Sequence, residues 1–277
     1  MKILAGSSSL MLAKNLAKLL GIEIANVSIK RFPDGECYVK INDEMEHAII
    51  VQNTYPDENI IELFLLQDAA RRIADRIDVI IPYYGYGRQD KIFEVGESIS
   101  AEKMARLIEQ DADSIILINP HKEHIANFFR AAAKICDGVP VIARYFKNKV
   151  NVVVAPDKGA IEMAKKAANI IGCRYDYLEK TRISSEEVYI EKKEGIEGSI
   201  LILDDIISTG GTMVKAVEMI KKKADEIYVA CIHGLFIGNA DERILKAGCK
   251  QIISTDTIET AYSKVSVAEE VVKCLSS

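Results

Sequence analysis

The sequence lacks the marks of several protein classes. It has no tryptophan, and no apolar run approaches the ~18 residues that a membrane-spanning helix needs. It also lacks an excess of basic residues, since 36 Lys and Arg stand against 41 Asp and Glu, for a formal net charge of −5. We therefore expect no membrane span and no nucleic-acid-binding surface, because such a surface requires a strongly basic face.

The cysteines also exclude two classes. The chain has 6 cysteines and no C-x-x-C pair among them, which fits neither a zinc site nor the disulfide framework of a small secreted domain. At the N-terminus, a short apolar stretch is broken by Gly-Ser-Ser-Ser, which favours a strand and loop over a signal peptide. These features predict a protein of the reducing cytoplasm.

The fold class follows from the alternation of two hydrophobic patterns. Short apolar runs typical of strands occur at residues 2–5, 48–52, 79–82, 115–119, 152–155, 200–203, 227–232 and 252–254. Helical periodicity lies between most of them, most clearly over residues 60–73 and 160–171. This alternation predicts an α/β protein with mainly parallel sheets flanked by helices. A length of 277 residues suits two domains, and we place them at residues 1–146 and 147–277. The similar rhythm of the halves raises the hypothesis of a structural duplication.

Residues 200–212, with the sequence ILILDDIISTGGT, carry the most informative motif. A buried strand is followed by two carboxylates and then by a loop that opens a helix near Met213. Backbone N–H groups and hydroxyls of such a loop can bind a phosphate, with the positive end of the helix behind them. Asp204 and Asp205 would repel that phosphate and suit a neighbouring diol or a divalent cation. The alternative is that the motif only ends a strand and caps a helix.

Two further elements of the second half suit the same ligand. Asp157 follows the strand at 152–155 and should lie at the same sheet edge, although it could simply cap the next helix. Lys180 and Arg182 alternate along a polar stretch between two β-like runs. They could close over a polyphosphate, or they could be solvated surface residues.

The first half contributes three candidate elements. Residues 31–36, RFPDGE, form a turn with acids that can accept hydrogen bonds. Residues 82–91, PYYGYGRQDK, follow a strand and match neither a G-x-G-x-x-G nor a Walker A loop, yet Arg88 and Gln89 suit a nucleotide. His121 follows another strand and could be a ligand, a base or a capping residue.

Taken in order, these motifs resemble those of one family, the ribose-phosphate diphosphokinases, also called phosphoribosyl pyrophosphate synthetases. The shared motifs are R-F-x-D-G-E, P-Y-x-x-Y-x-R-Q-D, the strand-terminal His, P-D-x-G, K-x-R and D-D-x-x-x-T-G-G-T, which together span nearly the whole chain. The resemblance implies two domains of type I phosphoribosyltransferase-like topology. It also implies transfer of the β,γ-diphosphoryl group of Mg-ATP to the 1-hydroxyl of ribose 5-phosphate, with AMP as the other product.

The resemblance also implies residue roles. The catalytic pair would be Lys180 and Arg182, and Mg²⁺ would be held at His121 and Asp157. ATP would be bound by Phe32, Asp34, Glu36, Arg88, Gln89, Asp90 and His121. Ribose 5-phosphate would be bound by Asp204, Asp205, Ser208, Thr209, Gly210, Gly211 and Thr212. The active site would be shared between subunits of a homo-oligomer, a dimer or a hexamer, because residues 32–36 contact adenine from a neighbouring subunit.

Two departures from the family pattern stand out. Ser208 occupies a position where many members carry an acid, so a hydroxyl must replace that contact. Residues 92–98, IFEVGES, are basic in many relatives. Two other functions remain open: a phosphoribosyltransferase, which would leave residues 31–36 and 83–90 unexplained, and a non-catalytic regulatory relative, which the intact Lys180/Arg182 and Asp204/Asp205 pairs disfavour.

Overall fold

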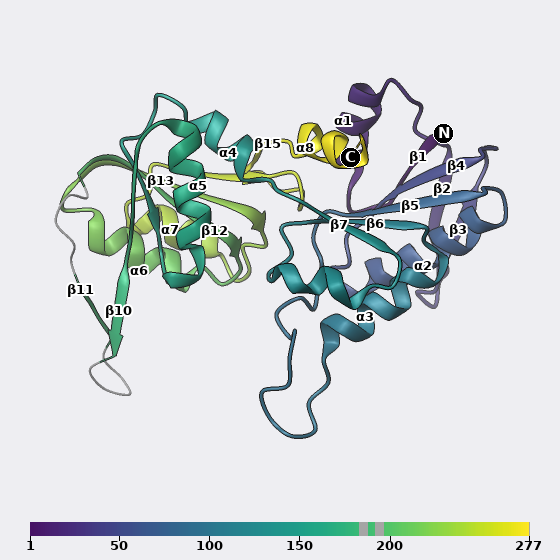
Figure 1. Ribbon diagram of the computed structural model, residues 1–277, viewed down its shortest axis with the longest axis horizontal. Helices are drawn as coiled ribbons and strands as arrows, with labels where there is room; N and C mark the ends of the chain where they lie inside the picture. The colour runs from purple at the N-terminus through teal and green to yellow at the C-terminus, as the bar shows by residue number, and fades with distance from the viewer. Residues whose placement is uncertain (183–187, 192–196, 277) are drawn as a thin grey trace. The chain divides into compact units, whose positions relative to one another are not determined.

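The computed structural model describes the backbone of residues 1–182, 188–191 and 197–276, and the side chains of these residues except 179–182 and 188–191. The chain folds into two compact units (Figure 1). Unit 1 comprises Met1–Asp137, Asp256–Glu259 and Ser266–Ser277, and unit 2 comprises Gly138–Thr255 and Thr260–Val265. Within the described residues, no helix combines the length and the hydropathy needed to cross a membrane.

Unit 1 is built on a five-stranded parallel sheet. Its strands, in spatial order, are β1 (Lys2–Ala5), β4 (His47–Val51), β5 (Arg76–Ile81), β6 (Ser114–Ile118) and β7 (Ala132–Cys136). Its helices are α1 (Leu10–Leu20), α2 (Asp57–Arg71), α3 (Ser100–Ile108) and α8 (Ala268–Ser276), with 3₁₀ turns η1 (Glu109–Asp111) and η2 (Glu123–Phe128). Leu63 and Leu66 of α2 pack with Ile50 and Val79 of the sheet in one core. The strands are Ile, Leu and Val runs because helices cover both faces.

Unit 2 is built on a six-stranded parallel sheet. Its strands, in spatial order, are β15 (Ser263–Val265), β14 (Gln251–Thr255), β13 (Ala224–Gly234), β12 (Gly198–Ile207), β8 (Val152–Ala155) and β9 (Arg174–Tyr177). Its helices are α4 (Val139–Phe146), α5 (Ile161–Ile171), α6 (Gly211–Ile220) and α7 (Ala240–Ala247), with the 3₁₀ turn η3 (Lys158–Ala160). Val217 and Ile220 of α6 and Ile244 of α7 pack with Ile202 and Val229 in its core. The α/β class with parallel, helix-flanked sheets is therefore confirmed.

The two units share one topology. In unit 1 a bridge between Ile3 and Ile24 extends the sheet beyond β1, so the order runs Ile24, β1, β4, β5, β6, β7. In unit 2 the order runs β9, β8, β12, β13, β14, β15. A separate antiparallel hairpin occurs at the same point of each unit, β2 (Val27–Arg31) with β3 (Cys37–Ile41), and β10 (Glu179–Arg182) with β11 (Val188–Glu191). The hypothesis of a structural duplication is confirmed at the level of strand order.

The division into units differs from the boundary predicted between residues 146 and 147. Helix α4 belongs to unit 2, because it packs on α5 and the β13–β15 side of that sheet. Helix α8 belongs to unit 1, because it packs on α1 and β7. The prediction assumed that each domain is one continuous stretch, whereas unit 1 recovers two segments from the end of the sequence.

Strand β12 is longer than the sequence pattern indicates. The apolar run ends at Leu203, but the strand continues to Ile207 because β13 pairs with it as far as Gly234. Asp204 and Asp205 therefore lie within a strand, and helix α6 begins at Gly211 instead of Met213.

Candidate active site

Asp204 and Asp205 lie where β12 loses one of its two neighbours. Strand β8 pairs with β12 only as far as the Val154–Ile202 pair and ends at Ala155, whereas β13 continues alongside β12. The two carboxylates are half-buried at this notch in the carboxyl edge of the sheet. Ligands of open α/β sheets bind at such an edge, so the location agrees with the sequence prediction.

The carboxyl group of Asp204 is held in an unfavourable electrostatic environment. Burial, together with repulsion from the neighbouring Asp205 and Asp157 carboxylates, raises its pKa to about 8. Its Oδ1 accepts a hydrogen bond from the backbone N–H of Asp205 at 3.0 Å, and Asp205 Oδ1 accepts one from Ile206 N–H at 2.8 Å. A hydroxyl donor or a divalent cation would relieve this repulsion.

The loop after β12 presents an uncapped helix end. Gly210 is the N-cap of α6, with φ of 71°, and no side chain caps the helix. The first-turn N–H groups of a helix have no intrahelical acceptor and so attract an anion. A Cβ on Gly210 would lie 2.9 Å from Ala240 Cβ, so this approach to α7 requires glycine. The alternative that the motif caps the helix holds only in that Gly210 is the N-cap residue, since none of the motif's side chains makes a capping hydrogen bond.

The loop is braced by the chain that follows β13. Ile207 O accepts hydrogen bonds from Leu235 N–H at 2.9 Å and Phe236 N–H at 3.1 Å, and Ser208 O accepts one from Ile237 N–H at 3.0 Å. The Arg243 guanidinium of α7 donates to Thr209 O. The sequence analysis missed this support, because the bonds use backbone groups and Arg243 belongs to no motif.

Asp157 combines two roles that the sequence analysis treated as alternatives. Its Oδ1 accepts a hydrogen bond from Gly159 N–H at 2.9 Å, so it is the N-cap of η3. It also lies close enough to Asp204 to raise the pKa of that group. The capping interpretation is confirmed, and it is compatible with a place at the carboxylate cluster.

The predicted adenine-contacting residues form the tip of the β2–β3 hairpin in unit 1. Phe32, Asp34 and Glu36 are all exposed there. Asp34 Oδ1 accepts from Glu36 N–H at 3.1 Å, and the Phe32 and Tyr38 rings meet edge to face with centroids 5.9 Å apart. The predicted turn at residues 31–36 is confirmed, and its side chains are presented outward.

Residues 88–90 follow β5 and have distinct environments. Arg88 is exposed, whereas the Gln89 side chain accepts a hydrogen bond from Ser100 Oγ at 2.7 Å and its carbonyl accepts from Ala101 N–H at 3.1 Å. Gln89 therefore orders the start of α3. Asp90 is buried and lies 3.1 Å from His124 Nε2, a partner that the sequence analysis missed.

His121 follows β6, the neighbour of β5, so it shares the carboxyl edge of the unit 1 sheet with residues 88–90. It is half-buried. Across the described residues, no group of three His, Cys, Asp or Glu side chains is placed to hold a metal ion. Magnesium, however, commonly takes one or two carboxylates together with substrate phosphates and prefers oxygen ligands. The donor set of Asp157, Asp204 and Asp205 fits that preference better than the His121 imidazole.

Lys180 and Arg182 belong to strand β10, which pairs with β11. The positions of their side chains lie outside the described part of the structure. The sequence pattern places them on a polar stretch between two β-like runs, whereas the backbone places them within strand β10 of a hairpin.

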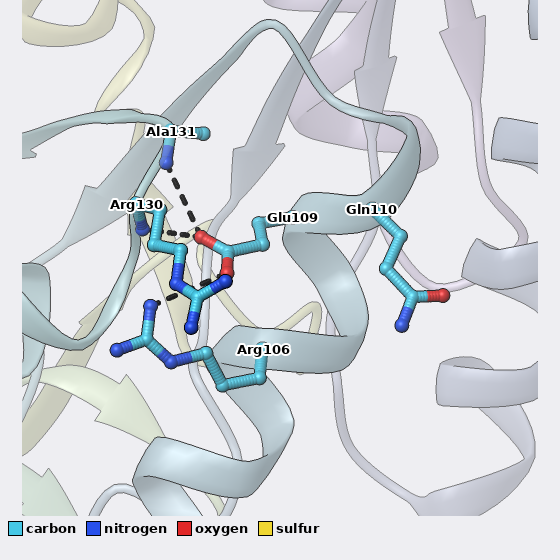
Figure 2. A pocket seen from close by; sticks show the side chains of 5 residues that line it. All are labelled: Arg106, Glu109, Gln110, Arg130 and Ala131. Atoms are coloured by element: carbon cyan, nitrogen blue, oxygen red, sulfur yellow. Dashed lines mark hydrogen bonds and ion pairs between the residues drawn. The ribbon is translucent and has the colours of Figure 1, made fainter.

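A pocket of about 610 Å³ lies elsewhere in unit 1, lined by Arg106, Glu109, Gln110, Arg130 and Ala131 (Figure 2). Glu109 accepts hydrogen bonds from the Arg130 and Ala131 N–H groups and pairs with Arg106 at 3.3 Å. These bonds, together with the Arg106 charge, outweigh desolvation and hold the pKa of Glu109 below its usual value. None of the predicted site residues lines this pocket, and its ion pair already neutralises one arginine.

Comparisons with known proteins agree with the two-unit architecture. Residues 1–111 match the model of the N-terminal domain of ribose phosphate pyrophosphokinase, and residues 121–269 match that of the phosphoribosyl transferase domain. The chain is 39% identical over 272 residues to ribose-phosphate pyrophosphokinase 2 of Archaeoglobus fulgidus, covering 97% of this chain and 98% of that protein. It is 37% identical to ribose-phosphate pyrophosphokinase of Methanopyrus kandleri, covering 100% and 99% of the two chains.

A solved structure is similar over nearly the whole chain. The crystal structure of phosphoribosylpyrophosphate synthetase from Mycobacterium smegmatis superimposes with a TM-score of 0.86 at 26% sequence identity. The alignment covers 99% of this chain and 97% of that one.

Proposed function

The chain belongs to the ribose-phosphate pyrophosphokinase family, and we propose that it transfers the diphosphoryl group of Mg-ATP to the 1-hydroxyl of ribose 5-phosphate. The products are 5-phosphoribosyl 1-diphosphate and AMP. The observation that carries the proposal is the adjacency of a carboxylate pair, Asp204 and Asp205, to the uncapped N-terminus of α6. This arrangement suits a ligand that carries a phosphate and hydroxyl groups together.

Ribose 5-phosphate is assigned to the carboxyl edge of the unit 2 sheet. The 5-phosphate accepts hydrogen bonds from the first-turn N–H groups of α6 and from the hydroxyls of Ser208, Thr209 and Thr212. The sugar hydroxyls donate to Asp204 and Asp205. Hydrogen bonds from the sugar hydroxyls offset the repulsion between these carboxylates. The binding of the sugar thus accounts for two acids placed side by side at a functional site.

ATP is assigned to unit 1. Arg88, Gln89, Asp90 and His121 lie at neighbouring strand ends of its sheet. Phe32, Asp34 and Glu36 are exposed at a hairpin tip, as residues that serve a neighbouring subunit must be. Bound Mg²⁺ would be held at Asp157, beside Asp204, and would supply charge neutralisation on the phosphates; the role of His121 at the metal stays a prediction.

Phosphoryl transfer depends on positioning and charge stabilisation more than on covalent chemistry. Lys180 and Arg182 are assigned the role of stabilising the negative charge that develops on the oxygens of the transferred phosphoryl group. Because the transition state is loose, the 1-hydroxyl places little demand on a strong base, and its proton leaves to Asp157 or to solvent.

The products test the proposal directly. Incubating the protein with Mg-ATP and ribose 5-phosphate should give AMP and no ADP, as resolved by anion-exchange chromatography. ADP formation, or no consumption of ATP with any pentose phosphate, would contradict it. A phosphoribosyltransferase would instead consume 5-phosphoribosyl 1-diphosphate with a nucleobase, which the same chromatography detects.

We also propose a homo-oligomer, a dimer or a hexamer, acting in the cytoplasm with its active site shared between subunits. A Phe32→Ala variant and a Lys180→Ala variant are each expected to be nearly inactive. Mixed under conditions of proven subunit exchange, they should regain activity, because some mixed sites contain both intact residues. Absence of recovery would place each active site within one subunit.

A further inference from the structure

The end of α8 lies against the end of β7 within unit 1 (Figure 1). The Lys134 ammonium donates to Cys274 O at 3.2 Å, and Cys274 Sγ contacts Ile135 O at 3.8 Å. Two consecutive residues of β7 therefore hold Cys274 from both its backbone and its side chain. This fixes Cys274 beside the next residue of the strand, which is Cys136.

The Cys274 thiol lies close enough to Cys136 to raise the pKa of the Cys136 thiol. Both cysteines are in the thiol form; Cys136 is 0% exposed and Cys274 is half-buried. A disulfide needs the two Cβ atoms about 3.5–4.5 Å apart, a separation that the packing of α8 on β7 sets, and side-chain rotation then brings the sulfurs together. Cys136 at the end of β7 and Cys274 on α8 are thus held near each other by two other contacts between these elements.

The thiols of unit 2 are placed differently. Cys173 Sγ contacts Arg174 O at 3.5 Å, Cys249 Sγ contacts Gln251 O at 3.1 Å, and Cys231 bonds to the Ile207 backbone. Each of these side chains interacts with the backbone, and among the described residues no second cysteine sulfur shifts the pKa of any of them, unlike that of Cys136. They behave as small buried or half-buried apolar residues and offer internal controls.

We propose that Cys136 and Cys274 form an intramolecular disulfide by exchange with a low-molecular-weight disulfide, fastening the C-terminal helix to the end of β7. The more accessible Cys274 thiolate attacks one sulfur of glutathione disulfide and releases one glutathione thiolate. Cys136 then gives up its proton and attacks the Cys274 sulfur of the mixed disulfide, releasing the second. Two cysteine thiols are oxidised, and one glutathione disulfide is reduced to two thiols.

The order of the two steps follows from the environments of the sulfurs. Burial, the Cys274 sulfur and the Glu270 and Asp137 carboxylates raise the pKa of Cys136, so it is a poor initial nucleophile. The mixed disulfide at Cys274 therefore forms first, and the ring closes in a slower second step. The closed ring contains all of unit 2, because that unit lies between Cys136 and Cys274 in the sequence.

The experiment treats the full-length native protein with excess glutathione disulfide in mildly alkaline buffer. Samples are then denatured, alkylated and analysed by intact mass and peptide mapping. The wild type should lose two hydrogens, keep four alkylatable thiols of its 6, and yield a peptide joining Cys136 to Cys274. Dithiothreitol should restore all of them. The control Cys173→Ser should still form the bond.

Two variants make the result decisive. Cys136→Ser should stop at a stable glutathione adduct on Cys274, and Cys274→Ser, at a half-buried site, should form no cross-link. The oxidised wild type should also unfold several degrees above the reduced protein, a difference absent in Cys274→Ser. A wild type that accumulates only the Cys274 adduct, or that cross-links through another cysteine, would overturn the proposal. The readouts are mass and stability, so they do not depend on the proposed reaction.

Discussion

The two units have different polar side chains at the same point of the same topology, acids in unit 2 and amides in unit 1. In unit 2 the buried segment 200–203 is followed by Asp204 and Asp205, and in unit 1 the buried segment 48–51 is followed by Gln52 and Asn53. The equivalent strands are β12 and β4, each third from the same side of its sheet once the Ile24 bridge is counted as the first position. The acids of unit 2 are therefore replaced by side-chain amides in unit 1.

Unit 1 satisfies its own loop. The Glu62 carboxylate, 1% exposed, accepts hydrogen bonds from Ser7 N–H and Ser7 Oγ, both at 2.7 Å, and from Gln52 Nε2 at 2.8 Å. A Cβ on Gly6 would lie 2.2 Å from Gln52 Oε1, so this loop is closely packed. An internal anion occupies the donors that an external ligand would use.

The helices that follow differ in the same sense. Helix α2 of unit 1 has Asp57 and Glu58 in its first turn, whereas α6 of unit 2 has no acid there. Acids in the first turn neutralise the positive end of a helix. The comparison teaches that one fold provides an anion site only where its own side chains leave the strand and helix ends unsatisfied.

The largest test of the comparison concerns the two hairpins, which share a topological position. A Lys180→Ala/Arg182→Ala double variant should lower kcat by about 10³-fold or more, because its charges act mainly in the transition state. Binding of ATP, measured by calorimetry, should change little. Lys40→Ala, on β3 of the other hairpin, is the control and should retain full activity. Equal losses of affinity and turnover would show that the pair only binds substrate.

Removing both acids of β12 should make unit 2 resemble unit 1. An Asp204→Asn/Asp205→Asn variant should lose about 10²-fold in kcat/KM for ribose 5-phosphate, since charged acceptors of hydrogen bonds contribute about 1.5–3 kcal/mol each. The exposed carboxylate at the start of β13 supplies the matched control, Asp225→Asn, which should behave as wild type. Unchanged kinetics in the double variant would show that the sugar does not bind at Asp204 and Asp205.

Disturbing the internal anion of unit 1 should affect stability first. Glu62→Gln places an amide where Ser7 N–H and Gln52 Nε2 both donate, and should lower the free energy of unfolding by about 1–3 kcal/mol. Chemical denaturation measures this change, with Glu58→Gln, an exposed residue of the same helix, as the control. A neutral result would mean that the carboxylate does not hold the loop.

The pKa of Asp204 predicts a dependence of stability on pH. Its folded value of about 8 exceeds its ordinary value of 3.8, so the folded protein binds this proton more tightly than the unfolded chain. The contribution is fully present below pH 3.8 and is lost as the pH rises through about 8. Asp204→Asn should therefore raise the free energy of unfolding by roughly 1–2 kcal/mol in alkaline buffer and leave it unchanged in acid. If the gain in the free energy of unfolding were the same at every pH, it would not come from the protonation of Asp204.

The smallest effect is expected at Ser208, which stands where many family members carry an acid. Ser208→Ala should raise KM for ribose 5-phosphate by about fivefold, the loss of one hydrogen bond of ~1 kcal/mol, and leave KM for ATP unchanged. Ser199→Ala, at the start of β12, the strand that ends just before Ser208, is the control. If Ser208→Ala changes neither constant, the hydroxyl does not contact the phosphate.

The parts of the fold that depend on burial were predictable from the sequence. The short apolar runs in β1, β8 and β12 must be buried, and a parallel strand covered on both faces buries them. The predicted positions of these strands were therefore correct to within a few residues. The β2–β3 hairpin was missed because its strands lie outside the main sheet and are half-exposed, which weakens the pattern. The return of α8 to unit 1 depends on tertiary contacts that no local pattern records.

The site was predictable where a motif places polar groups at strand ends, as for Asp204 and Asp157. Glu62, His124 and Arg243 were missed for a shared reason. Each lies on a helix or 3₁₀ turn and acts through a partner far away in the sequence, at Ser7, Asp90 and Thr209 respectively. Their spacing resembles that of any amphipathic helix, so only the assembled structure distinguishes them.

The placement of α8 in unit 1 has a consequence for biosynthesis. A chain emerging from a ribosome presents β1 to β7 first, but the helix that packs on α1 and β7 is made only after all of unit 2. Multidomain chains commonly fold from the N-terminus onward. Here we expect unit 2 to complete its fold before unit 1. Unit 1 is complete only when α8 has been synthesised and Ala268 and Val271 are buried against it.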